Sequence, residues 1–331
     1  MKKTIAVLLA AVLMLLSVSA LGDATFTLNA YMGYKGEKLS MRVSYDGKDR
    51  GKMLTICDEA GNVLGERELS SAKGYWNIET MLPADAPAGQ QITMYIDGVE
   101  QDTALLASEN RPGYSLVRVD RDDKKIAITF DAANAASKTA AILDVLDKYG
   151  AKCTFFVIGR YVVNNPDLTR EIEARGHELA GHSWDHPEMP SLNNDQILED
   201  FRKISEAFVE VLGHDVTLYR PPSGYSSQRD RAIARALGQE VIKWTIDSRD
   251  GFSDTTLNTV IKRVKNNVGS GDIVLMHVYG KHTIAALEEL LPWYIEQGYS
   301  FVTVSDLLLE GDTIIDTDGV QQYRVKETEN Q

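Results

Sequence analysis

The most constraining feature of the sequence is an alternation of two patterns between about residue 124 and residue 310. Short runs rich in isoleucine, valine and phenylalanine alternate with longer stretches of helical periodicity, and glycine stands at many of the junctions. Strands and helices repeated in this way pack as a parallel sheet covered by helices, and seven repeats are enough to close a barrel. We therefore predict an α/β fold, a (β/α)7 barrel, for residues 124–310. The strand-like runs are Lys125–Asp131, Cys153–Ile158, His177–Gly181, Thr217–Arg220, Glu240–Ile246, Asp272–His277 and Ser300–Val304.

The segment before this region has a different pattern. Between residues 25 and 107, apolar and polar residues alternate with period two, as in Leu39–Tyr45, and Asp-Gly pairs mark turns. Short alternating strands separated by turn signals predict a small all-β sandwich of the immunoglobulin-like kind. Residues 108–123 are then expected to be a linker, and the polar residues 311–331 a surface tail.

The first twenty residues have the pattern of a targeting segment. Residues 1–20 start with a methionine and two lysines, continue in an apolar run from Ile5 to Val18 and end in small residues. This pattern predicts a secretory signal peptide and therefore a secreted or envelope-associated protein, with an uncleaved anchor as the alternative. No later run of about eighteen apolar residues occurs, so we expect no transmembrane span after signal removal.

Charge and cysteine content exclude several classes of function. The formal net charge is −13, from 35 lysines and arginines against 48 aspartates and glutamates. An acidic chain repels phosphate backbones, so we expect no nucleic-acid partner. Two cysteines are too few for a disulfide framework or a thiolate zinc site. Cys57 and Cys153 are predicted to be small buried hydrophobes, and a bond between them is the alternative.

Polar residues gather where the predicted strands end. Each of these positions alone is compatible with a solvated sheet edge. Together they indicate a functional site, because the carboxyl ends of barrel strands meet at one rim and carry the catalytic residues of such folds. These residues are Asp131, His182, His186, Arg220, Asp247, Asp250 and His277.

The histidine pair suggests a metal. His182 and His186 are four residues apart, so on a helical turn both rings would project from one face and grip one divalent ion. Two surface histidines at a helix start are the alternative.

The same residues carry a resemblance to a known family. The motifs TFDAAN, GHELAGHSWDH, RPPSG, DSRD and LMH, in this order, resemble those of the polysaccharide deacetylases, which form the NodB-like domain of carbohydrate esterase family 4. The resemblance covers residues 115–310, and the opening TFDAA is most similar to the sporulation-type branch. It implies a distorted (β/α) barrel, in agreement with the strand and helix pattern.

The resemblance also implies an activity and a cofactor. Members of this family hydrolyse acetyl groups on amino sugars of peptidoglycan or chitin-like glycans, with water activated by a divalent metal that is usually zinc. By motif position, His182 and His186 would ligate the metal. Asp131 would be the base that takes a proton from the water, and Arg220 would keep Asp131 ionised and oriented.

Four further roles follow from the same motifs. His277 would be the acid that protonates the leaving amine, and Asp250 would pair with it and keep it protonated. The backbone N–H of Ser223 would help to stabilise the oxyanion. Leu275 would line the pocket for the acetyl methyl group.

The sequence departs from the family at a metal ligand. Most members have a second aspartate after the base, and here that position is Ala132, which cannot ligate. Catalytic zinc usually has three protein ligands, so the site has one too few. Three outcomes are possible. Extra waters could complete the coordination of the metal, or a neighbour such as Asn134 or Asp185 could ligate it. Otherwise the protein has neither metal nor turnover.

Two other departures concern the pocket. Gly251 stands where the family usually has tryptophan, which removes a pocket wall that Phe252 or Trp244 would have to replace. Ser223 replaces a tyrosine, which matters less because the role belongs to the backbone.

Two functions from different classes remain. The first is an exported metal-dependent deacetylase acting on an acetylated cell-wall glycan, with either N-acetyl or O-acetyl groups as targets. The second is a noncatalytic glycan-binding or scaffolding envelope protein, which Ala132 and Gly251 favour.

Overall fold

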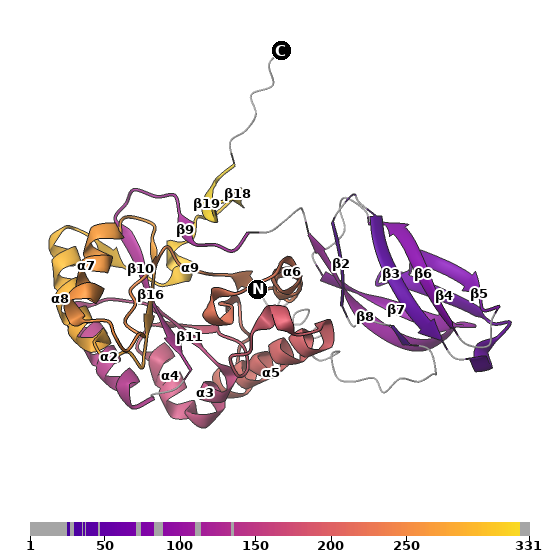
Figure 1. The fold of residues 1–331 in the computed structure, drawn as a ribbon, viewed down its shortest axis with the longest axis horizontal. Coiled ribbons are helices and arrows are strands. Elements are labelled where there is room, and N and C mark those ends of the chain that lie inside the picture. Colours follow the sequence, from indigo (N-terminus) through magenta and orange to yellow (C-terminus); the bar gives the residue numbers. More distant parts are fainter. Residues whose placement is uncertain are drawn as a thin grey trace, which may run out of the picture. The chain divides into compact units, whose positions relative to one another are not determined.

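The computed structural model describes residues 25–26, 30–34, 36, 38–45, 47–70, 74–82, 89–109, 114–133 and 136–324 (Figure 1). The chain divides into two compact units, Met1–Arg111 and Pro112–Gln331. The predicted signal peptide, residues 1–20, lies outside the described residues. Within the described part of the chain, no helix is both long and apolar enough to cross a membrane.

The N-terminal unit is a sandwich of two sheets, with strand orders β1-β3-β6 and β2-β8-β7-β4-β5. Alternate residues of β3, among them Leu39 and Met41, are buried with Leu54 and Ile56 of β4 in one apolar cluster. Because both sheets contribute to this cluster, they pack face to face. The elements are β1 (Thr25–Phe26), β2 (Ala30–Tyr34), β3 (Lys38–Tyr45), a 3-10 turn (Gly47–Asp49), β4 (Met53–Asp58), β5 (Val63–Glu68), β6 (Gly74–Met81), β7 (Gly89–Ile96) and β8 (Val99–Glu109).

The C-terminal unit alternates strands and helices, as the sequence pattern predicts. Its strands are β9 (Arg118–Val119), β10 (Lys125–Ala132), β11 (Thr154–Val157), β12 (Glu178–Gly181), β13 (Leu218–Tyr219), β14 (Glu240–Val241), β15 (Ile246–Asp247), β16 (Ile273–His277), β17 (Ser300–Phe301), β18 (Thr313–Ile315) and β19 (Val320–Tyr323). Its helices are α2 (Ala136–Tyr149), α3 (Gly159–Asn164), α4 (Pro166–Ala174), α5 (Asn194–Leu212), α6 (Gln228–Ala236), α7 (Leu257–Asn267), α8 (Thr283–Glu296) and α9 (Val304–Leu307), with 3-10 turns at Met189–Ser191 and Pro222–Gly224.

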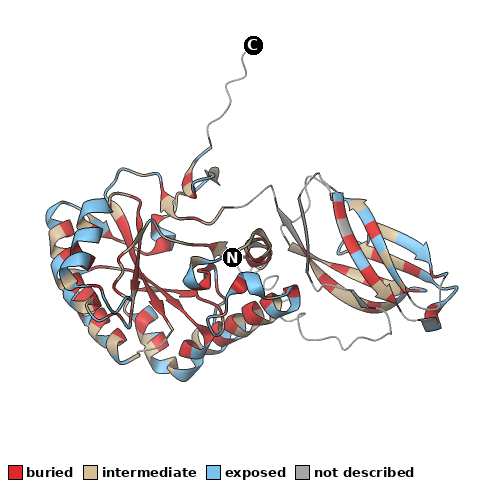
Figure 2. Ribbon diagram, in the orientation of Figure 1, coloured by how far each residue is buried: buried red, intermediate tan, exposed pale blue. Residues whose placement is uncertain are grey.

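A curled, eight-stranded parallel sheet forms the centre of this unit. Its order is β14-β13-β12-β11-β10-β16-β15, and β17 pairs with the start of β10. β10 is buried along nearly its whole length, since it has strands on both sides and apolar residues packed on both faces. Figure 2 shows the strands largely buried and the outer faces of the helices exposed. The predicted α/β barrel class is confirmed.

The barrel is open, because the predicted strand Glu240–Ile246 does not form as one strand. This prediction was wrong. The run Glu240–Ile246 is divided into β14 and β15, which lie at opposite ends of the sheet. Between them, the N–H of Lys243 donates to the Leu116 carbonyl at 2.6 Å and that of Thr245 to the Ile273 carbonyl at 2.9 Å. The residues between β14 and β15 therefore cross the gap between the two edges of the curled sheet. An apolar run indicates burial but does not show which sheet edge each residue pairs with.

The segments expected to be linker and tail pack onto the second unit. Leu116 and Val119, within residues 108–123, are buried in its apolar core. In residues 311–331, β18 and β19 form an antiparallel hairpin, and β19 also pairs in parallel with β9. Cys57 and Cys153 are both free thiols.

Candidate active site

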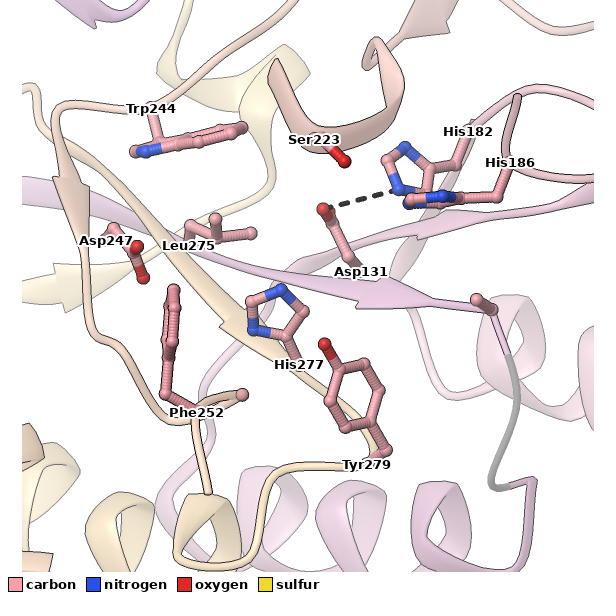
Figure 3. A pocket seen from close by; sticks show the side chains of 12 residues that line it. Asp131, His182, His186, Ser223, Trp244, Asp247, Phe252, Leu275, His277 and Tyr279 are labelled. Carbon is pink, nitrogen blue, oxygen red and sulfur yellow. Dashed lines mark ion pairs between the residues drawn. The ribbon is translucent and has the colours of Figure 1, made fainter. Parts of the chain in front are cut away.

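A pocket of about 320 Å³ lies at the carboxyl ends of the strands of the curled sheet (Figure 3). This is the end of a parallel barrel at which catalytic residues gather. Of the predicted site residues, Arg220 and Asp250 lie behind its wall and the rest line it. The full lining is Asp131, Ala133, His182, His186, Ser223, Trp244, Asp247, Gly251, Phe252, Leu275, His277 and Tyr279.

Asp131 and Arg220 form a buried ion pair. Asp131 is 7% exposed and Arg220 is 0% exposed. The guanidinium donates from Nη1 to Asp131 Oδ1 at 2.8 Å and from Nη2 to the Lys243 carbonyl at 3.0 Å. Burial alone would raise the pKa of the Asp131 carboxyl, but the charge that His182 carries when protonated and the permanent charge and hydrogen bond of Arg220 outweigh it and hold the pKa below its usual value. Asp131 is therefore an ionised carboxylate able to accept a proton.

The two histidines meet at the other side of Asp131. His182 donates from Nδ1 to the Arg220 carbonyl at 2.8 Å. Because a carbonyl only accepts, this bond places the proton on Nδ1 and leaves the Nε2 lone pair free. That Nε2 lies 3.4 Å from Asp131 Oδ2, and the His186 ring centre is 5.0 Å from that of His182. Burial lowers the pKa of His182 below its usual value, against the opposing charge of Asp131, which favours the neutral ring.

The prediction that a helical turn brings the two rings together is wrong. The segment is a loop in which Ser183 and His186 have left-handed backbone angles, with φ of 69° and 60°. The first amides of α3 hold the loop, since Gly159 N–H donates to the Ser183 carbonyl at 3.0 Å. A Cβ on Gly159 would lie 2.3 Å from the Trp184 ring, so glycine is needed for this packing.

His277 and Asp250 form the second pair of the site. His277 Nδ1 lies 2.9 Å from Asp250 Oδ1, and the His277 backbone N–H donates to Asp250 Oδ2 at 2.9 Å. Burial alone would lower the pKa of His277, but the hydrogen bond and charge of Asp250 outweigh it and raise the pKa above its usual value. The geometry therefore favours a protonated imidazole beside the pocket.

Sequence reasoning missed Thr283, the first residue of α8. Its buried hydroxyl donates to Asp250 Oδ2 at 2.6 Å and lies 3.0 Å from the His277 carbonyl. A Cβ at Gly280 would lie 2.2 Å from this hydroxyl, so a glycine is required in the connecting loop. The available signal is a hydroxyl residue at a helix start soon after a strand that ends in histidine.

Asp131 and His277 are direct neighbours in the sheet. They are register partners in the parallel pair β10 and β16. Adjacent strands lie about 4.8 Å apart, so the two side chains enter the pocket side by side. The structure thus brings a carboxylate whose pKa is lowered and an imidazole whose pKa is raised to one level of the rim.

Ser223 and Leu275 also face the pocket. Ser223 lies in the 3-10 turn Pro222–Gly224 with a left-handed φ of 55°. The next residue, Gly224, packs under Trp244, since a Cβ there would lie 2.7 Å from the indole ring. Leu275 precedes His277 by two residues in β16 and so faces the same side of the sheet.

A third protein ligand for a metal is absent from the described residues. No group of three or more histidine, cysteine, aspartate or glutamate side chains there is arranged to hold an ion. Ala132 is fully buried in the apolar cluster, whereas Ala133 lines the pocket. Asp185 pairs with Arg160 at 3.0 Å and does not line the pocket. Asn134 lies outside the described residues.

The two histidines nevertheless fit a metal in part. A ligating histidine commonly donates its other ring N–H to a carbonyl, as His182 does to Arg220. Its neutral Nε2 and the adjacent His186 ring form half of a tetrahedral set.

The wall at Gly251 is rebuilt by aromatic residues. A Cβ on Gly251 would lie 2.9 Å from His277 Nδ1 and 3.0 Å from the Tyr279 hydroxyl. Tyr279, Phe252 and Trp244 all line the pocket, and the Tyr279 ring centre is 5.0 Å from that of His277. Tyr279 was not anticipated, although it follows the histidine of the last motif by two residues.

Comparisons with known proteins show the family to which the chain is similar. Residues 118–242 match the family model of the polysaccharide deacetylases. The peptidoglycan-N-acetylglucosamine deacetylase of Bacillus cereus is 37% identical over 210 residues, which are 62% of this chain and 98% of that protein. The peptidoglycan-N-acetylglucosamine deacetylase PgdA of Listeria monocytogenes is 34% identical over 238 residues, 70% of this chain and 49% of that protein. The chain thus spans about half the length of the Listeria relative.

A solved structure adds a second kind of relative. A Bacillus anthracis protein described as a pseudoenzyme of carbohydrate esterase family 4 matches with a TM-score of 0.57 and 27% identity, over 63% of this chain and 75% of that one. The curled sheet and its rim define the class of NodB-like carbohydrate-active barrels. The chain belongs to the polysaccharide deacetylase family, as its motifs indicate.

Proposed function

We propose that this protein is an exported, metal-dependent deacetylase that hydrolyses N-acetyl groups on amino sugars of a cell-wall glycan. One observation carries the proposal. The register partners Asp131 and His277 have opposite environments, because Arg220 keeps the first ionised and Asp250 favours the protonated form of the second. Amide hydrolysis needs such a pair, since one proton leaves the attacking water and another reaches the leaving amine.

Each residue then has a step. Asp131 accepts the proton of the water that attacks the acetyl carbonyl, while Arg220 holds its carboxylate in place. His277 gives its Nε2 proton to the amine nitrogen as the carbon–nitrogen bond breaks. Asp250 fixes the ring through Nδ1 and stabilises its positive charge.

The remaining residues shape the pocket around the acetyl group. The backbone N–H of Ser223 would donate to the developing oxyanion, and Leu275 would contact the methyl group. His182 and His186 would hold the divalent metal, with zinc as the expected ion. When bound, the metal supplies Lewis-acid polarisation of the carbonyl and lowers the pKa of water.

Acetate release tests this proposal directly. The substrates are N-acetylglucosamine oligosaccharides and purified peptidoglycan, with and without a chelator. We expect Asp131→Asn to reduce release by about 10²- to 10⁴-fold, which is the usual effect of losing a general base. Asp254→Asn is the matched control, because Asp254 is exposed and does not line the pocket. Full activity in Asp131→Asn would show that the roles are misassigned.

A noncatalytic glycan-binding protein is the second candidate, and the incomplete ligand set favours it. Ala132 is buried in the apolar core, and no group of three or more histidine, cysteine, aspartate or glutamate side chains in the described residues is arranged to hold an ion. Metal content separates the candidates without a choice of substrate. Near-stoichiometric metal in the wild type that is lost in His182→Ala supports the enzyme. Absence of metal in the wild type, even with excess ion, supports the binding protein.

Export is proposed from residues 1–20 alone. Their basic start, apolar run and small residues support a cleaved signal peptide. N-terminal sequencing of the protein recovered from a bacterial envelope fraction tests it, since an intact Met1 would contradict cleavage.

A further inference from the structure

Asp247 is a carboxylate in the pocket that the acid–base steps do not use. It is the last residue of β15 and the register partner of Leu275. In Figure 3 it lies beside Phe252, at the end of the pocket away from His182 and His186. It is therefore placed to contact the part of a substrate that extends beyond the acetyl group.

The charge of Asp247 is not neutralised as those of the other two carboxylates are. Asp131 is 2.8 Å from the Arg220 guanidinium and Asp250 is 2.9 Å from the His277 ring. In the described parts of the chain, the carboxylate of Asp247 has one donor, the backbone N–H of Arg249 at 2.7 Å, and no cationic side chain within 4.0 Å.

The nearest arginines point to other partners. The Arg249 guanidinium lies 4.4 Å from the centre of the Phe252 ring. Arg263 donates from Nε to the backbone carbonyl of Asp247 at 3.0 Å, which leaves the carboxylate unpaired. The lining contains no lysine or arginine. The charge of Asp247 helps to raise the pKa of His277, but the ion-pair partner of His277 is Asp250, so Asp247 remains a carboxylate without an ion pair.

We propose that Asp247 makes the pocket select neutral 2-acetamido sugars and reject those that carry a free carboxylate next to the acetamide. This inference rests on the proposed deacetylase function. The two sugars of peptidoglycan differ at carbon 3, where glucosamine has a hydroxyl and muramic acid has a lactyl ether. Carbon 3 adjoins the carbon that bears the acetamide, and a pocket of about 320 Å³ holds little more than one sugar. A lactyl carboxylate would therefore enter the same space as Asp247.

The repulsion is large enough to measure. Two like charges about 6 Å apart, in a medium between protein and water, repel by an amount that corresponds to about a tenfold change in rate. A metal held by His182 and His186 would lie at the opposite end of the pocket and would not cancel this effect locally.

Peptide-free peptidoglycan strands test the inference by internal competition, because both sugars alternate in one polymer. Mass spectrometry of the digested strand shows which sugar has lost its acetyl group. We expect wild type to deacetylate glucosamine units about tenfold or more faster than muramic acid units. Asp247→Asn should narrow this ratio about tenfold, and Asp254→Asn, an exposed carboxylate outside the pocket, should leave it unchanged.

A chemical control separates charge from bulk. Converting the lactyl carboxylates to amides keeps their size and removes their charge, so discrimination in wild type should largely disappear. An unchanged ratio in Asp247→Asn, or equal discrimination against the amidated strand, overturns the inference. If wild type releases no acetate, the proposed function fails, and NMR titration with N-acetylglucosamine and N-acetylmuramic acid decides the inference. Weaker binding of the acidic sugar, relieved by Asp247→Asn, supports it, and equal binding overturns it.

Discussion

Replacing Asp131 by asparagine removes the counter-charge of a fully buried guanidinium. Arg220 is 0% exposed, and in the described structure its only carboxylate partner is Asp131, at 2.8 Å. Asparagine keeps the shape and one hydrogen-bond acceptor but loses the negative charge. Leaving a buried charge unpaired destabilises a protein by roughly 3–5 kcal/mol. For a domain of this size, each kcal/mol lowers Tm by about 2–4 °C, so we expect Asp131→Asn to melt about 6–20 °C below wild type.

Thermal unfolding of metal-free protein, followed by circular dichroism, measures this loss without the contribution of a bound ion. Arg220→Met should be destabilised less than Asp131→Asn. The double variant should recover much of the stability, because it buries no unpaired charge. Asp312→Asn is the control, since its pair with Arg324 is largely exposed and should contribute less than about 1 kcal/mol. A Tm for Asp131→Asn within about 2 °C of wild type, with no coupling in the double variant, would refute the reasoning.

Three further changes test the site. Asp250→Asn removes the charge that raises the pKa of His277, so we expect the basic limb of the kcat/KM profile to move to lower pH by about one unit or more. The stability that this pair adds is present at acid pH and lost as pH rises through the raised pKa, so the same variant should lose least stability at high pH. Thr283→Val takes a donor from Asp250, which should raise the pKa of His277 in an NMR titration and lower kcat about tenfold, while Thr283→Ser restores both values. Ala132→Asp places a carboxylate at a fully buried position, so it should lower Tm strongly in chelator and regain it with zinc; a Tm insensitive to zinc would show that the carboxylate does not reach the ion.

The fold class could be predicted from the sequence because buried strands and helices have characteristic patterns of apolar residues. β10 reads as a continuous apolar run ending in Asp131, as expected for a central parallel strand covered on both faces. The division of Glu240–Ile246 into two strands could not be predicted, because no residue pattern marks the break. Both halves of that run are apolar, and the hydrogen bonds from Lys243 to Leu116 and from Thr245 to Ile273 depend on where the chain lies in space.

The site could be predicted where its residues end strands. Asp131 and His277 do so, and parallel register alone makes them neighbours. The fold of the histidine loop could not be predicted, because the left-handed angles of Ser183 and His186 occur at residues that usually avoid them. The role of Thr283 could not be predicted either, because its hydrogen bond to Asp250 depends on the path of a loop in the folded structure.

The two halves of the rim differ in completeness, and this difference bears on whether the protein is an enzyme. Buried ion pairs are weak contributors to stability and can often be replaced by apolar residues without loss. A barrel that served only as a scaffold would therefore gain little from the pairs Asp131–Arg220 and Asp250–His277, whereas proton transfer requires both. The metal half has two histidines and no third ligand among the described residues. Metal affinity, rather than acid–base chemistry, should then limit turnover, so excess divalent ion should raise acetate release by wild type and leave Asp131→Asn inactive.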